Sequence, residues 1–140
     1  MDFPLKLPPE TDIMVSLKKS LDATLLRHEV IANNIANADT PGYKRLDITF
    51  KAALKEALKK DSFRGVRTNK KHIPIGPPGL NEVKPSIFRE TDTFYRNDRN
   101  NVDIDVEMGE LAKNSINYST LIRLISEKYN NLETSISGRL

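Results

Sequence analysis

The chain has 140 residues, a net charge of +3, no tryptophan and no cysteine. Its length suits about one domain, and the missing cysteines exclude disulfides, cysteine nucleophiles and thiolate metal sites. No stretch approaches the roughly 18 apolar residues of a membrane span, and residues 1–12 lack the basic start and apolar run of a secretory signal peptide. We therefore expect no membrane insertion and no cleaved signal peptide.

The charge is unevenly distributed along the chain. Residues 1–43 and 101–140 each carry a net charge of −2, whereas residues 44–100 carry +7. A basic segment can bind nucleic acid, but these basic residues lack interleaved aromatic side chains and a known binding motif. We favour a solvated face or a surface that meets acidic neighbours, and we expect no nucleic-acid partner.

Residues 1–12 contain Pro4, Pro8 and Pro9 and predict a non-helical arm. A helix is expected over 13–40, with Thr11 or Asp12 as its N-cap. Apolar residues beside its seam (Leu25, Leu26 and Val30) predict more than one partner for this helix. Its heptad seam, with alternating spacings of three and four, comprises Met14, Leu17, Leu21, Thr24, His28, Ile31, Ile35 and Ala38.

His28 on this seam allows two interpretations. A histidine can ligate a metal or act as a pH switch, but the only other histidine is His72, and no Asp/Glu/His cluster accompanies either. We interpret His28 as a hydrogen-bonded core or interface residue. The sequence predicts no catalytic, cofactor or metal site, and hence a protein that is not an enzyme.

The end of this helix is crowded with asparagines. Asparagine is a poor helix former because its amide competes for backbone hydrogen bonds, so we expect some of these amides to bond to a neighbour. Pro41 disfavours helical geometry at Thr40, and Pro41-Gly42 suits the central positions of a type II turn. The predicted assembly motif comprises Asn33, Asn34, Ile35, Asn37, Thr40, Pro41, Gly42 and Tyr43.

Residues 41–100 form a basic middle segment that contains several prolines and glycines. A short amphipathic helix is expected at about 49–60, with Lys51, Lys55, Lys59 and Lys60 on a solvated face. Prolines and glycines exclude a long helix over 61–100, and alternating residues over 86–95 predict a short strand.

A second heptad helix is expected over 101–140. Asp103 or Asp105 can cap its start, and Gly138 can end it. A seam sustained over more than four heptads indicates a coiled coil. It comprises Ile104, Met108, Leu111, Ser115, Tyr118, Ile122, Ile125, Tyr129, Leu132 and Ile136.

These segments together predict a mainly α fold. The helices over 13–40 and 101–140 would pair as an antiparallel coiled coil and form a helical core domain. The loop-rich middle would hold the short helix and short β segments. Each long helix would keep a second apolar strip for other molecules.

The string ANNIANADTPGYKR (32–45) resembles the N-terminal signature of bacterial flagellar axial proteins, which include rod and hook subunits. The longer strings LLRHEVIANNIANADTPGYKRLDITF, KKHIPI and NNVDIDVEMGELAKNSINYSTL resemble the proximal rod subgroup. This resemblance implies a structural subunit of the basal body that assembles through its terminal helices into a helical tube, crosses the periplasm and transmits torque.

The resemblance also implies partners. They are copies of the chain, other rod subunits, the adaptor protein at the rod base and the flagellar type III export apparatus. Seam residues would join subunits, the asparagines would fix their register, and the Thr40–Gly42 turn would set where the helix leaves the tube wall. The alternatives are a sister proximal rod protein or a cytoplasmic coiled-coil adaptor.

Overall fold

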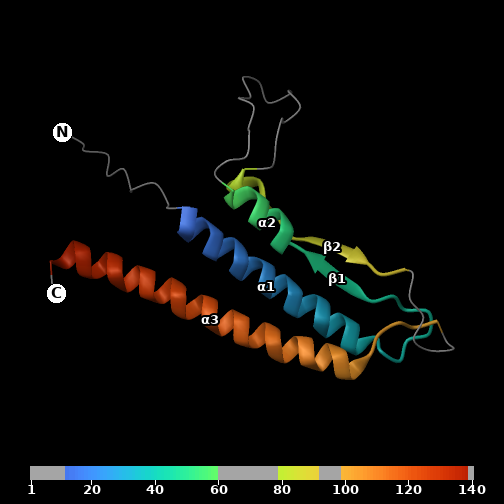
Figure 1. Cartoon of the computed structure of the whole chain (residues 1–140). Helices are drawn as coiled ribbons and strands as arrows, with labels where there is room; N and C mark the ends of the chain where they lie inside the picture. Colours follow the sequence, from blue (N-terminus) through green and yellow to red (C-terminus); the bar gives the residue numbers. More distant parts are fainter. Residues whose placement is uncertain (1–11, 60–78, 92–98, 139–140) are drawn as a thin grey trace, which may run out of the picture.

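A computed structural model describes residues 12–59, 79–91 and 99–138 (Figure 1). The arm was predicted over 1–12; its last residue, Asp12, begins α1, and the rest of it lies outside these residues, as does the KKHIPI string. The elements are α1 (Asp12–Ala36), β1 (Leu46–Thr49), α2 (Lys51–Leu58), the 3-10 turn η1 (Leu80–Glu82), β2 (Ser86–Arg89) and α3 (Ile104–Ser137).

The predicted antiparallel pairing of the two long helices is confirmed. α1 and α3 lie side by side and run in opposite directions (Figure 1). α3 has 34 residues and α1 has 25. The C-terminal turns of α3 therefore extend past the start of α1, and every residue from Ser126 to Gly138 is exposed.

Both long helices are shorter than predicted. α1 ends at Ala36 rather than at 40, because the next amides make tighter bonds: Ala38 N–H bonds to the Ile35 carbonyl at 3.2 Å. α3 begins only at Ile104, where the Asp103 carboxylate caps the helix by accepting bonds from two backbone amides. Gly138, with φ of 63°, ends it as predicted.

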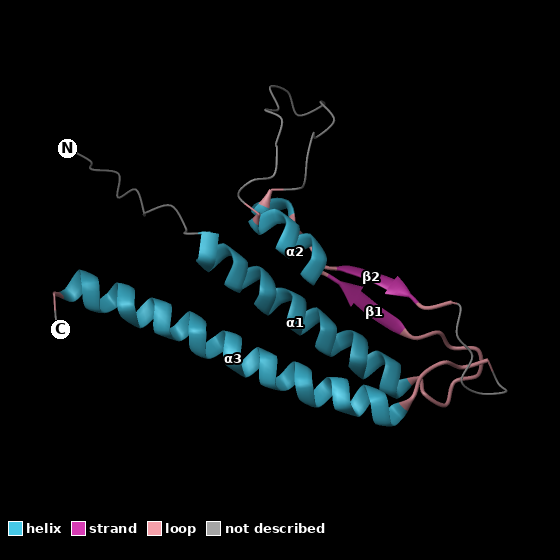
Figure 2. Cartoon of the chain, viewed as in Figure 1, coloured by secondary structure: helices cyan, strands magenta, loops and turns pink. Residues whose placement is uncertain are grey.

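A two-stranded antiparallel sheet occupies part of the middle segment (Figure 2). Leu46 pairs with Arg89, and Thr49 pairs with Ser86. The strand predicted over 86–95 ends at Arg89, and residues 92–95 lie outside the described residues. β1 was not predicted as a strand, and it occupies the position where the short helix was expected to begin. α2 is therefore shorter than 49–60.

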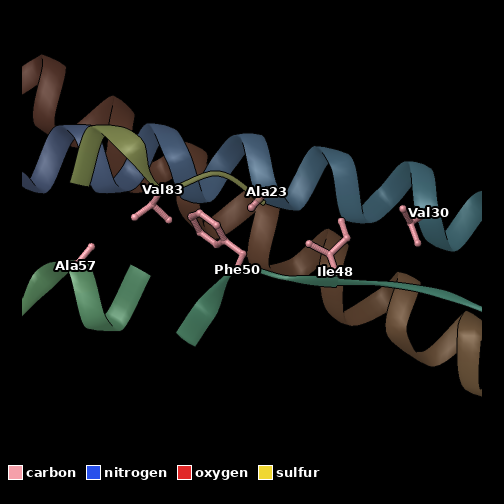
Figure 3. Close-up of a cluster of buried hydrophobic side chains, with 6 residues drawn as sticks. All are labelled: Ala23, Val30, Ile48, Phe50, Ala57 and Val83. Carbon is pink, nitrogen blue, oxygen red and sulfur yellow. The ribbon is translucent and has the colours of Figure 1, made fainter. Parts of the chain in front are cut away.

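α1 is the central layer of the fold, because α3 contacts one side of it while β1 and η1 contact the other. The main hydrophobic cluster lies on the side of α1 that faces the sheet. Figure 3 shows the Phe50 ring pointing toward α1 and Val83. The cluster comprises Ala23, Val30, Ile48, Phe50, Ala57 and Val83.

The interface between α1 and α3 has a different character. The buried residues of α3 are Glu107 and Asn114, both polar. The coiled-coil interface predicted as an apolar seam therefore depends on specific polar contacts as well as on apolar area.

Replacing Phe50 with alanine tests the cluster. Phe50 is 7 % exposed and Phe88 is 40 % exposed. We expect Phe50→Ala to lower the free energy of unfolding by about 3–5 kcal/mol, because it empties a packed site. Phe88→Ala, the matched control on β2, should cost less than about 1 kcal/mol. Urea unfolding followed by circular dichroism measures both, and equal losses would contradict this assignment of the core.

Candidate functional site

The predicted assembly motif folds into the corner where α1 ends and the chain turns toward β1. Gly42 has φ of 73°, and the Tyr43 N–H bonds to the Thr40 carbonyl at 3.2 Å. Both features match the type II turn predicted at Pro41-Gly42, because its third position requires a positive φ. The turn reverses the chain, so that Tyr43 and Arg45 return toward the last turns of α1.

Asn34 is the hub of this corner, and its side chain is fully buried. Its amide bonds both backbone groups of Leu46: Nδ2 donates to the carbonyl at 2.8 Å, and Oδ1 accepts from the N–H at 2.9 Å. Nδ2 also donates to Glu107 Oε2 at 3.1 Å, and Oδ1 accepts from the Tyr43 hydroxyl at 3.3 Å. Two donors and two acceptor positions are the full capacity of an asparagine amide.

The Glu107 carboxylate on α3 is matched by Arg45. Arg45 Nε donates to Glu107 Oε1 at 2.6 Å, and Nη1 donates to Glu90 Oε1 at 2.9 Å. Nη1 also lies 3.4 Å from Asp47 Oδ2. Glu107 is fully buried, and a buried charge is tolerated only when it is paired and hydrogen-bonded. The guanidinium occupies the space among three carboxylates.

This surrounding charge perturbs two pKa values. Burial opposes the charge on Arg45, but the hydrogen bond to Glu107 and the nearby carboxylates outweigh it, so the pKa of Arg45 lies above its usual value. Burial is also the main cause that raises the pKa of the Tyr43 phenol, which Glu107 raises further and Arg89 lowers. Tyr43 therefore keeps the proton that it donates to Asn34.

Two asparagines before α3 complete the corner, and sequence reasoning missed their role. Asn100 Nδ2 lies within hydrogen-bond distance of the Asn37, Ala38 and Thr40 carbonyls, at 3.1, 2.8 and 2.9 Å. These groups follow the last turn of α1, where helix carbonyls lack intrahelical partners. Asn101 Oδ1 accepts from the Arg45 N–H at 2.6 Å, and its Nδ2 donates to the Glu90 carbonyl at 3.0 Å. The only sequence signal was the Asn100-Asn101 pair, which Val102 separates from the Asp103 cap.

The other motif asparagines lie nearer the surface. Asn33 is exposed and Asn37 is half-buried. Asn37 Nδ2 donates to the Asn33 carbonyl at 2.8 Å, and the Thr40 hydroxyl lies 3.3 Å from Asn37 Oδ1. The role of Asn33, Asn34 and Asn37 in fixing the register between subunits remains a prediction.

The predicted seam residues divide between covered and exposed positions. On α1, Ile31 is buried, while Leu17, Leu21 and Ile35 are half-buried. On α3, Leu111, Tyr118 and Ile125 are half-buried, whereas Met108, Ile122, Tyr129 and Leu132 are exposed. The side chains of a straight α-helix drift around its axis relative to a strict heptad repeat. In addition, the last turns of α3 extend past the start of α1 at Asp12. The heptad pattern therefore runs partly off the contact with α1.

His28 is exposed, so it is not a core residue of the single chain, and its role as an interface residue remains a prediction. It lines a small cavity of about 270 Å³ between α1 and α3, together with Tyr118 and Asn114. Asn114 Nδ2 donates to the Thr24 carbonyl at 2.9 Å across the helix pair. Its Oδ1 is buried and has no hydrogen-bond partner among the described residues. Sequence reasoning also missed Asn114, which lies one residue before the predicted seam position Ser115.

Among the described residues, no group of three His, Asp or Glu side chains is arranged to hold a metal ion. None of the described helices is long and apolar enough to cross a membrane. Hydrogen bonds in the corner around Asn34 connect α1, β1 and α3. This arrangement serves to hold the three elements in place.

The comparisons with known proteins identify the family. Residues 20–44, which include Asn34 and the turn, match the family model described as flagella basal body rod protein. The chain is 36% identical over 123 residues to flagellar basal body rod protein FlgB of Bacillus subtilis, covering 88% of this chain and 92% of that protein. The chain belongs to the FlgB family of flagellar basal body rod proteins.

Other FlgB proteins match over similar lengths. The protein from Borrelia hermsii is 37% identical over 120 residues, which cover 83% of this chain and 89% of that relative. The protein from Aeromonas hydrophila is 36% identical over 114 residues, with 80% and 83% covered. Membership of this family assigns the chain a structural role in the basal body rod, and neither alternative considered from the sequence is favoured.

Replacing Asn34 with aspartate tests the hub. Asn34→Asp removes the donor that faces the Leu46 carbonyl and places a second carboxylate against Glu107. Breaking such a buried network costs about 3–5 kcal/mol, so we expect that loss in the free energy of unfolding. The neighbouring exposed residue provides the control, and Asn33→Asp should cost less than about 1 kcal/mol. Similar losses in urea unfolding would contradict the hub assignment.

A double-mutant cycle tests the pair of Arg45 and Glu107. Arg45→Met alone should cost about 3–5 kcal/mol, because it leaves Glu107 buried without its cation. Arg45→Met combined with Glu107→Met should cost much less than the sum of the single changes. The exposed pair of Lys113 and Glu110, 2.9 Å apart, serves as the control. Its coupling energy should be about 0.3–0.5 kcal/mol, and an equal value for Arg45 and Glu107 would contradict the assignment.

Proposed function

We propose that this chain is a structural subunit of the proximal rod, which assembles through its terminal helices into a helical tube that transmits torque. The match to FlgB over nearly the whole length of both proteins carries this proposal. Its partners are copies of the chain, other rod subunits and the adaptor protein at the rod base. It has no enzymatic activity and needs no cofactor.

The route to this location follows from the same proposal. The chain is exported through the flagellar type III apparatus without a cleaved signal peptide, and it reaches the part of the rod that crosses the periplasm. The similarity to FlgB rod proteins supports this location. In this proposal the chain is held in the rod by contacts with neighbouring proteins.

The exposed apolar residues of α3 support assembly through the terminal helices. Tyr129 is 50% exposed, Leu132 is 49% exposed and Ile136 is 87% exposed. They follow the heptad seam beyond the end of the contact with α1. A contiguous patch of exposed apolar side chains marks a protein–protein interaction site. In this proposal the α3 seam and the assembly motif around Thr40–Tyr43 contact neighbouring subunits.

Replacing Leu132 with serine tests this function. Leu132 contributes little to the fold of the single chain, so Leu132→Ser should change the free energy of unfolding by less than about 0.5 kcal/mol. In cells, the variant should be depleted from isolated basal bodies, and swimming should be reduced. Asn131→Ser, at the adjacent exposed position outside the seam, is the matched control and should leave both unchanged. Absence of the unmodified chain from basal bodies would refute the proposed function itself.

A further inference from the structure

A groove runs along α1, with α2 on one side and α3 on the other. Its volume is about 540 Å³. Apolar side chains from all three elements line it, chiefly Phe50, Leu54, Leu58 and Leu121, together with Ala23 on the floor. Leu58 is 46% exposed, so the rim of the groove already presents apolar surface to an incoming chain.

Two polar features of the groove restrict what can occupy it. Lys51 and Lys55 line its α2 side, and within the described residues neither forms an ion pair. On the α3 side, the Lys113 amine is paired with Glu110 at 2.9 Å. The buried Asn114 Oδ1, which has no partner among the described residues, also belongs to the lining. An apolar segment with exposed carboxylates would complement these lysines.

One segment of the chain has this chemistry, and we name residues 103–108 the α3 start. Ile104, Val106 and Met108 are 44%, 53% and 51% exposed. The charges within the segment are all acidic, with Asp105 exposed and Asp103 half-buried. The other exposed apolar clusters complement the lysines of the groove less well. Phe88 on β2 adjoins the basic Arg89, and the exposed end of α3 (126–138) carries charges of both signs.

The α3 start and the groove cannot meet within one copy. Val106 and Asn117, which lines the groove, lie on the same helix and are separated by about 17 Å at ~1.5 Å per residue. A second copy that lies beside the first, and is displaced by this distance along the helix axis, would bring its α3 start to the groove of the first. The two surfaces differ, so such a contact is heterologous and can repeat without closing into a ring.

We propose that the groove between α2 and α3 receives the α3 start of a second copy. This inference rests on the proposed function and specifies which surface of one subunit meets which surface of the next. Lys51 and Lys55 of the receiving copy face Asp105 of the incoming copy. Ile104 and Met108, which lie one helical turn apart on the same side of α3, cover the Phe50–Leu58 side of the groove.

Cysteine cross-linking tests the contact, because the natural chain has no cysteine. Leu58→Cys and Met108→Cys are made in separate full-length chains, mixed in equal amounts and oxidised with diamide. We expect the mixed dimer to exceed either homodimer by at least about fivefold, as a heterologous contact requires. The control pairs Leu58→Cys with Ile136→Cys, whose site is 87% exposed in the natural chain. Equal yields for the two pairs would overturn the proposal, because cross-linking would then follow exposure alone.

A charge exchange gives an independent readout. Lys55→Glu and Asp105→Lys should each lower the cross-linking yield by about two- to fivefold, in keeping with an exposed ion pair. The two changes combined in one chain should restore it. Asp105→Asn controls for loss of the charge without reversal. Failure of the combined variant to recover, with both single variants folded by circular dichroism, would overturn the proposed alignment.

Isolated basal bodies separate this inference from the proposed function. Both variants are co-expressed in the same cells. If the Leu58→Cys copy then cross-links to a different basal body protein, or to no protein, while both copies are present, the groove assignment is wrong and the proposed function stands. If the chain is absent from basal bodies, the proposed function fails first. A cross-link between Leu58→Cys and Met108→Cys copies within the basal body supports both.

Discussion

The structure depends on the burial of one carboxylate in the contact between two helices. Glu107 on α3 is fully buried, where an unmatched charge would cost several kcal/mol. Arg45 supplies the opposite charge and the Asn34 amide supplies a further donor. These two residues come from opposite sides of the turn at Pro41-Gly42. Satisfying Glu107 therefore requires the end of α1, the turn and the strand that follows to occupy one arrangement.

This requirement explains why α1 contains asparagine near its end although asparagine disfavours the helical conformation. Asn34 lowers the intrinsic helix propensity of α1, yet its amide bonds both backbone groups of Leu46, as a neighbouring strand would. Asn100 likewise donates hydrogen bonds to the carbonyls after α1, which lack partners within the helix. Local preference and tertiary contact disagree here, and the tertiary contact prevails because every polar group of the amide finds a partner.

The separation of polar and apolar contacts suits a subunit that assembles. Apolar packing is concentrated between α1 and the sheet side, whereas directional hydrogen bonds orient α3 against α1. Such bonds specify one pairing of the helices without consuming all of the apolar surface of α3. The remaining seam, the exposed α3 start and the lysine-lined groove stay available to other chains.

The sequence alone determined the two long helices, their antiparallel pairing, the turn at Pro41-Gly42 and the end of α3 at Gly138, and it limited the cap of α3 to Asp103 or Asp105. These features follow from local periodicity, capping chemistry and backbone preference. Tertiary structure alone decided that β1 forms at Leu46–Thr49, that His28 is exposed and that Glu107 meets Arg45. Each of these depends on which distant segment lies opposite, and a carboxylate in a helical repeat looks the same whether it faces water or a guanidinium 62 positions away.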